Sequence, residues 1–145
     1  MNMLLKDDDE STVINGKRIC IDFDGVIHKY SRKYHDGSIY DRPTEGVREF
    51  LLKLKDMGYC IFVHTSRPLA SDNPEGAIRL MEKWLKRWKI PYDFITMIKV
   101  PANAYIDDRA IRFTGDWNYV MKELDDIEDI NKDEGEWEYY HKEIV

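Results

Sequence analysis

The sequence predicts a single α/β domain built around a mainly parallel β-sheet. Short apolar runs rich in β-favouring residues alternate along the chain with longer segments whose apolar residues recur at helical spacing. This alternation is typical of units in which helices connect parallel strands. The chain has 145 residues, 43% of them hydrophobic, which suffices for one buried core without disulfides or metal ions.

The first predicted unit is a strand, a helix and a second strand. Residues 17–23 form the first strand. The helix begins after Thr44, a residue type favoured as an N-cap, and ends at Met57, just before Gly58. Its expected inward residues are Val47, Phe50, Leu51, Leu54 and Met57. Residues 59–64 form the second strand, and its last residue, His64, is expected to be a packed, hydrogen-bonded core residue.

The next predicted elements are a second helix and two short strands. Asn73 and Pro74 predict an N-cap with proline at the first helical position, and the helix ends near Lys89. Its expected inward residues are Ile78, Met81, Leu85 and Trp88, with Trp84 as a core partner of Trp88. Residues 94–98 and 104–106 are predicted to be buried strands.

A last helix is predicted after Asp116, which can cap it. Its expected inward residues are Trp117, Val120, Met121, Leu124 and Ile127. With this helix the domain extends over residues 17–130, between a polar leader at 1–16 and an acidic tail at 131–145.

Composition bears on where the protein works. The leader lacks the basic start and apolar core of a signal peptide, and no apolar run reaches the roughly 18 residues that a membrane span needs. The two cysteines, Cys20 and Cys60, lie in predicted strands without a CxxC partner and are expected to be buried free thiols. These features predict a cytoplasmic protein without membrane contact.

Polar residues follow the end of every predicted strand. In chain order they are Asp22 and Asp24, then Thr65, Ser66 and Arg67, then Lys99, then Asp107 and Asp108. The carboxyl ends of parallel strands meet at one edge, where open α/β sheets bind their ligands, so we expect these side chains in one crevice. Carboxylates at this density need a cation, and hard oxygen ligands suit Mg²⁺. A metal ion, a lysine and a hydroxyl then form a receptor for a phosphate group, with a free aspartate as nucleophile.

The order of these residues carries a family resemblance. The run Asp22-Phe23-Asp24-Gly25-Val26, then Thr65, then Lys99, then Asp107-Asp108 resembles the four signature motifs of the haloacid dehalogenase-like (HAD) superfamily of phosphatases. Residues 91–111 are similar to small hydrolases of that superfamily from bacteria and bacteriophages. The resemblance covers about residues 17–120 and implies a Rossmann-like, three-layer α/β/α fold.

The resemblance also implies catalytic roles. Asp22 would be the nucleophile that forms an aspartyl-phosphate, and Asp24 would be the general acid and base. Thr65 would hydrogen-bond a phosphoryl oxygen, and Lys99 would balance the charge of nucleophile and phosphate. Superfamily members that cleave carbon–halogen bonds typically lack the second aspartate of the first motif. Asp24 therefore favours phosphoryl transfer over dehalogenation.

The same resemblance implies a Mg²⁺ site. Asp22 and the Asp24 carbonyl would ligate the ion together with Asp107 or Asp108, and the sequence leaves open which of these two touches it directly. One departure from the pattern is Val100, which follows the motif lysine where many relatives have proline. It concerns only the local loop geometry.

The chain leaves little room for the cap domain that HAD enzymes commonly insert. Residues 26–42 fit a loop or hairpin, and residues 69–98 are filled by one helix and one strand. We therefore expect a capless enzyme or one with a minimal cap. Its open crevice suits a large substrate such as a polynucleotide end or a protein, or a small one enclosed by a second subunit of a homo-oligomer.

Charge discriminates weakly between substrates. The net charge of −6 argues against generic nucleic-acid binding. Residues 28–35, however, are basic and aromatic, and they make Lys29 and Arg32 candidate substrate contacts beside Ser66 and Arg67. Such a stretch could steer a phosphorylated small molecule or nucleic-acid end inward and stack on bases, and a solubilising surface loop is the alternative.

Two functions from different classes fit the sequence. The first is a Mg²⁺-dependent phosphomonoester hydrolase that acts through an aspartyl-phosphate on nucleotides or polynucleotide ends. The second is a catalytically silent HAD-like module that binds a phosphorylated ligand, or a protein partner through residues 134–140 of the tail. The presence of Asp24 favours the enzyme, because a binding module needs no general acid. The physiological substrate and the oligomeric state stay open.

Overall fold

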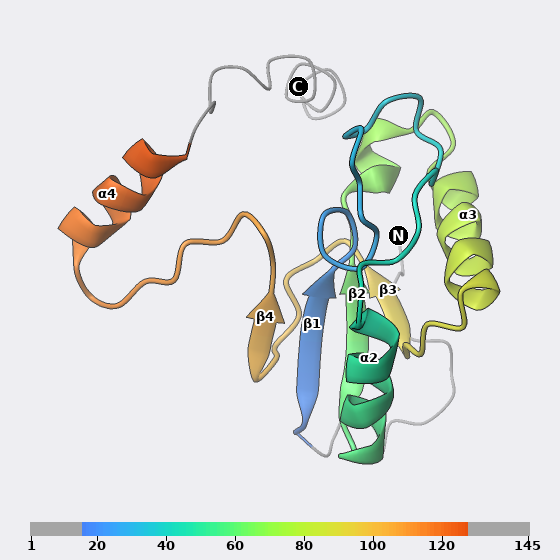
Figure 1. Cartoon of the computed structure of the whole chain (residues 1–145), viewed down its shortest axis with the longest axis horizontal. Helices are drawn as coiled ribbons and strands as arrows, with labels where there is room; N and C mark the ends of the chain where they lie inside the picture. Colours follow the sequence, from blue (N-terminus) through green and yellow to red (C-terminus); the bar gives the residue numbers. More distant parts are fainter. Residues whose placement is uncertain (1–15, 128–145) are drawn as a thin grey trace.

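The computed structural model describes residues 16–127 and contains a four-stranded, all-parallel sheet (Figure 1). The strands are β1 (Arg18–Asp22), β2 (Cys60–His64), β3 (Phe94–Thr96) and β4 (Ala104–Ile106), in the spatial order β3-β2-β1-β4. The predicted α/β class with a parallel sheet is confirmed. Since β1 lies between β2 and β4, Asp22 at the carboxyl end of β1 sits between the carboxyl ends of two neighbouring strands.

One face of the sheet carries the main core. Alternate residues of β1 and β2 point to this face, among them Ile21 and Val63, which are 1% and 0% exposed. Helices α2 (Val47–Asp56) and α3 (Pro74–Arg87) pack onto it (Figure 1). The residues that the two helices bury here are Val47, Leu51, Leu54, Met81, Trp84 and Leu85.

Helix α2 starts later than the sequence predicts. Its N-cap is Gly46, whose φ of 83° lies in the left-handed region that glycine tolerates. The Thr44 hydroxyl instead donates a 2.5 Å hydrogen bond to the Val26 carbonyl and ties the preceding loop to the helix start. Phe50 and Met57, both expected to be buried, are 44% and 52% exposed. The face of the helix that packs on the sheet is narrower than the run of apolar residues predicts.

Helix α3 has the predicted start. The Asn73 side chain accepts a hydrogen bond from the Gly76 N–H, and Pro74 occupies the first turn. Trp84 is buried as expected, whereas Trp88 is 38% exposed because it caps the helix end rather than lying on the inward stripe. A short 3₁₀ helix, η1 (Arg67–Ala70), precedes α3 and packs against it.

The second face of the sheet is covered by a loop rather than by a helix in the described part of the chain. Cys20, Cys60 and Phe62 form a small buried cluster there with Val100, which lies in the loop between β3 and β4. Both cysteines are free thiols, as predicted, and burial raises the pKa of each to about 11. Such thiols are unreactive packing residues.

Helix α4 (Trp117–Asp126) lies apart from the sheet (Figure 1). Asp116 caps it as predicted, by accepting a hydrogen bond from the Asn118 N–H. The expectation that its apolar residues face inward is wrong, since α4 buries none of its residues and Trp117 is 72% exposed. The physical reason is the extended segment from 107 to 116, which carries the helix away from β4.

The chain between β1 and α2 forms turns and isolated bridges. The polar leader up to residue 15 and the acidic tail at 131–145, with its candidate partner segment at 134–140, lie outside the described residues. Within residues 16–127, no helix is long and apolar enough to cross a membrane.

Candidate active site

Three carboxylates meet at the carboxyl edge of the sheet. One oxygen each from Asp22, Asp107 and Asp108 lies within 4.8 Å of the other two. The strand register explains the approach: Ile21 of β1 is paired with Ile106 of β4, so the residues that follow each of them leave the sheet side by side. The predicted approach of polar residues at this edge is confirmed for these three carboxylates.

Gly25 brings the third carboxylate into the group. Its φ of 84° lies in the left-handed region, and a methyl group built on it would collide with the Asp108 carboxylate. The turn after β1 can therefore lie directly against Asp108 only because residue 25 has no side chain.

Asp22 is the most shielded member of the group. Its side chain is 20% exposed, and burial, followed by the nearby charges of Asp107 and Asp108, raises its pKa. His64 acts in the opposite direction and lowers it. The His64 Nδ1 lies 3.7 Å from the Asp22 Oδ1, a distance that suits an ion pair better than a hydrogen bond, and the Asp22 carboxylate raises the pKa of His64 in turn.

A cavity of about 700 Å³ opens beside Asp22 on the second face of the sheet. Its lining includes Asp22, His64, Lys99, Tyr105, Asp107 and Arg112. The nucleophile candidate, the lysine and one acidic residue of the fourth motif therefore share one open space. Thr65 and Asp24 do not belong to this lining.

Lys99 reaches the cavity from an anchored loop. Its ammonium lies 5.0 Å from the centre of the Tyr105 ring, and the Tyr105 hydroxyl donates a 2.7 Å hydrogen bond to the Val100 carbonyl. Val100, the departure from the family pattern, is 3% exposed and packs into the cluster on the second face. The residue after the lysine thus anchors the loop by burial.

Thr65 is buried at the end of β2. Its N–H donates to the Thr96 carbonyl at 2.9 Å, and its hydroxyl oxygen accepts a 3.1 Å hydrogen bond from the Arg67 N–H. A hydroxyl that accepts from the backbone still has its own hydrogen to donate, which is the interaction that a phosphoryl oxygen needs. Ser66 is exposed and precedes η1.

Asp24 lies in a different environment from Asp22. Its Oδ2 accepts a 2.8 Å hydrogen bond from Arg67 Nε, and its Oδ1 accepts from Arg67 Nη2 at 2.9 Å and from His28 at 2.8 Å. Arg67, a predicted substrate contact, is only 3% exposed, and it also donates to the Gly37 carbonyl at 2.8 Å. The structure therefore places Arg67 behind Asp24 instead of on the open surface.

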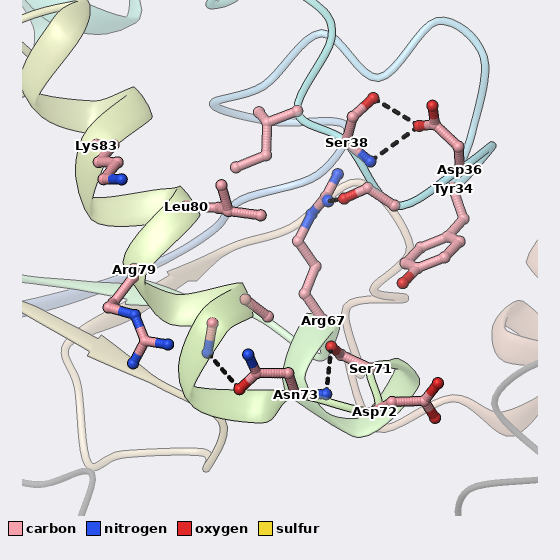
Figure 2. Close-up of a pocket in the computed structure, with 14 residues that line it drawn as sticks. Tyr34, Asp36, Ser38, Arg67, Ser71, Asp72, Asn73, Arg79, Leu80 and Lys83 are labelled. Carbon is pink, nitrogen blue, oxygen red and sulfur yellow. Dashed lines mark hydrogen bonds between the residues drawn. The ribbon is translucent and has the colours of Figure 1, made fainter.

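A second cavity, of about 660 Å³, lies between the loop after β1 and helix α3 (Figure 2). Figure 2 shows Arg67 extending across it toward the loop, with Arg79, Leu80 and Lys83 of α3 on the opposite side. This cavity lacks the carboxylate cluster, so its chemistry differs from that of the cavity beside Asp22.

The loop that contains the basic stretch 28–35 uses Tyr30, Tyr34 and Tyr40 for internal contacts. The Tyr40 hydroxyl donates to the Lys33 carbonyl and accepts from the Arg32 N–H, while the Arg32 guanidinium lies 4.4 Å from the centre of the Tyr40 ring. Tyr30 and Tyr34 flank the Arg67 guanidinium. Lys29 and Arg32 are exposed, so the two cations meet solvent while the tyrosines hold the loop together.

Comparisons with protein-family models, with curated proteins and with solved structures gave no match for this chain. The resemblance to the HAD superfamily therefore rests on the sequence motifs alone.

Sequence reasoning missed two histidines of the site. His64, expected to be a packed core residue, is half-buried and lines the cavity beside Asp22. His28 is fully buried and binds Asp24. The available signal for His28 was its position four residues after Asp24, a spacing that a tight turn can close into a contact. For His64 the signal was its register, since it is paired with Asp22 across β1 and β2.

Proposed function

We propose that the protein is a Mg²⁺-dependent phosphomonoester hydrolase that acts through an aspartyl-phosphate on Asp22. The observation that carries the proposal is the convergence of Asp22, Asp107, Asp108 and Lys99 at one sheet edge from three separate segments. Three carboxylates supply hard oxygen ligands, and Lys99 supplies a positive charge in the cavity that Asp22 and Asp107 also line. The ordered family motifs point to the same chemistry.

The residues of this chain fit a Mg²⁺ ion. Carboxylate oxygens that lie within 4.8 Å of one another repel unless a cation lies between them, and the raised pKa of Asp22 reflects that repulsion together with burial. Asp22, Asp107 and Asp108 would hold the ion, with the Asp24 carbonyl as a further candidate. When bound, Mg²⁺ neutralises charge on the transferring phosphoryl group.

The proposed reaction has two half-reactions. An Asp22 oxygen attacks phosphorus, the bond to the leaving oxygen breaks, and Asp24 supplies the proton that this oxygen takes up. Water then attacks the aspartyl-phosphate, Asp24 accepts a proton from the water, and inorganic phosphate leaves as Asp22 is regenerated. Lys99 stabilises the phosphoryl charge in both steps, and Thr65 donates a hydrogen bond to a phosphoryl oxygen.

The substrate class in this proposal is a phosphorylated nucleotide or polynucleotide end. The exposed Lys29 and Arg32 support it, because they stand on the loop that follows the catalytic aspartates. Replacing both by alanine should raise KM and flatten the salt dependence for a phosphorylated oligonucleotide, with little effect on a small aryl phosphate. An equal loss on both substrates would contradict the assignment of these two residues.

The proposal also includes a three-layer fold, the lack of a cap domain and a cytoplasmic location. A Rossmann-like domain has helices on both faces of its sheet, and the amphipathic α4 is the element of this chain that would supply the third layer. The open cavity beside Asp22 is consistent with a capless enzyme. The proposal places the protein in the cytoplasm, in line with its two reduced, buried thiols.

A screen tests the proposed activity. Purified protein with Mg²⁺ is incubated with nucleotides, sugar phosphates and 3′- or 5′-phosphorylated oligonucleotides, and released phosphate is measured. We expect turnover that is lost with a chelator and lost in Asp22→Asn. Full activity in either case would contradict the proposed mechanism.

One observation favours the alternative of a silent binding module. Both oxygens of the Asp24 carboxylate are engaged by Arg67 and His28, which is an arrangement that a purely structural aspartate would also have. A silent module should bind a phosphorylated ligand in the presence of Mg²⁺ without releasing phosphate from it. Calorimetry on the compounds of the screen separates binding from turnover.

A further inference from the structure

The Asp24 carboxylate is the centre of a buried hydrogen-bond chain that joins three parts of the fold. Arg67 comes from η1, His28 from the turn after β1, and both meet on Asp24, whose side chain is 17% exposed. Beyond them the chain continues to the Gly37 carbonyl on one side and to the Asp41 N–H on the other. Each link is a hydrogen bond of 2.8 to 3.0 Å.

The hydrogen bonds assign the tautomer of His28. The Asp41 N–H donates to the His28 Nε2 at 3.0 Å, so this nitrogen is the acceptor and carries no proton. The ring proton is therefore on Nδ1, which donates to the Asp24 Oδ1 at 2.8 Å. The ring itself is fully buried and is stacked against Phe23, with its centroid 5.6 Å away, so packing fixes its orientation as well.

Arg67 fixes the other side of Asp24. Its Nε and Nη2 contact the two carboxylate oxygens in a bidentate pair, which constrains the plane of the carboxylate as well as its position. A further hydrogen bond, from its Nη1 to the Gly37 carbonyl at 2.8 Å, holds the loop after β1. Lysine could keep the positive charge at this position, but its ammonium could not reproduce the bidentate contact with both carboxylate oxygens.

We propose that Arg67 and His28 are positioning residues that fix the Asp24 carboxylate for its proton transfers, which rests on the proposed phosphatase function. Both act through Asp24 and neither touches the reacting atoms. A carboxylate that must first deliver a proton and then accept one gains from being held in a single orientation, because a small misplacement is costly in rate. Because these hydrogen bonds continue to Gly37 and Asp41, the loop at 28–42 also helps to hold Asp24 in place.

Two variants of His28 separate positioning from packing. In His28→Asn the amide nitrogen replaces Nδ1 and keeps the donor to Asp24, whereas in His28→Gln the longer side chain reaches the Asp41 N–H and abandons Asp24. Both variants lose the same ring contacts, so they should lose similar thermal stability. We expect His28→Gln to lower kcat about 10-fold or more with little change in KM, and His28→Asn to restore most of that loss.

A double-mutant cycle tests whether Arg67 acts through Asp24. Arg67→Lys should lower kcat about 10- to 100-fold in the wild-type background and should have almost no further effect in the Asp24→Asn background. If the effects of the two substitutions multiply, Arg67 has a separate role and the proposal is wrong. The same conclusion follows if His28→Asn and His28→Gln reduce kcat equally.

A spectroscopic readout distinguishes failure of this inference from failure of the proposed function. In ¹⁵N-labelled protein, His28 should show a protonated Nδ1 and an unprotonated Nε2, and the Arg67 Nε–H signal should be protected from exchange until Asp24 is replaced by asparagine. Absence of these signals overturns the inference whatever the activity. If the signals are present but the wild-type protein hydrolyses no phosphomonoester, the proposed function is wrong. The positioning role is then wrong as well, and the hydrogen bonds around Asp24 are only a structural feature.

Discussion

Replacing Asp22 by asparagine should stabilise the metal-free protein at neutral pH, although it should abolish phosphoryl transfer. Burial and the charges of Asp107 and Asp108 raise the pKa of Asp22 above the ordinary value of 3.8. Between that value and the raised one, the folded state binds more protons than the unfolded state, so stability falls as the pH rises. Above the raised pKa the whole penalty is present, and asparagine removes it.

The size of the effect follows from the geometry. At 4.8 Å, the upper limit of the separations within the group, each like-charge pair costs roughly 0.9 kcal/mol with the dielectric constant of water. Asp22 takes part in two such repulsive pairs. When His64 is protonated, its attraction to Asp22 across 3.7 Å offsets about 1 kcal/mol of this repulsion. The net gain on substitution is therefore about 1 kcal/mol, or about 4 °C in Tm for a domain of this size.

Thermal unfolding with a chelator is the assay. Asp22→Asn should melt higher than the wild type at neutral pH, and the difference should vanish below the ordinary aspartate pKa, where both states are protonated. A saturating excess of Mg²⁺, about 100 times Kd, should raise the wild-type stability by about 2.7 kcal/mol and leave the variant unchanged. Asp125→Asn in α4 is the control and should change neither value. A lower Tm for metal-free Asp22→Asn at neutral pH would refute the reasoning about charge repulsion.

Two further predictions concern single side chains. Gly25→Ala should abolish the stabilisation by Mg²⁺, because its methyl group displaces the Asp108 carboxylate. Gly58→Ala is the control: this residue has the same φ of 84° but open space around it, so the variant should show only the backbone strain of about 1–2 kcal/mol. Equal responses of the two variants to Mg²⁺ would contradict this prediction. Trp117→Ser should change the free energy of unfolding by less than about 0.5 kcal/mol, because the ring is 72% exposed, whereas a loss of about 2 kcal/mol or more in chemical denaturation would show that α4 packs on the sheet as a third layer.

The strands and the carboxylate cluster were predictable from the sequence because both depend on local pattern plus one topological rule. Apolar runs bounded by polar residues located all four strands to within about two residues. The parallel arrangement then required the chain after β1 and β4 to leave the sheet at one edge, which brought Asp22 and Asp107 together. This inference needed no knowledge of the loops.

The environment of Asp24 was not predictable in the same way. Its contacts with Arg67 and His28 depend on the path of the loop after β1, where Tyr30 and Lys33 adopt positive φ angles that no propensity rule assigns to such residues. Helix faces were predicted only in part for a related reason. The apolar pattern of α4 identifies a helix correctly, but the extended segment before it decides whether the apolar face meets the sheet.

The central claim is that Asp22 is the nucleophile, and trapping the phosphoenzyme tests it most directly. Asp24→Asn is incubated with Mg²⁺ and an acyl or aryl phosphate, whose good leaving group needs little protonation, and the protein is analysed by intact mass and peptide mapping. The account predicts a mass increase of one phosphoryl group that maps to Asp22 and is absent when Asp22 is also replaced by asparagine. A label on Asp24 or Thr65, or turnover of Asp24→Asn at the wild-type rate, would contradict it.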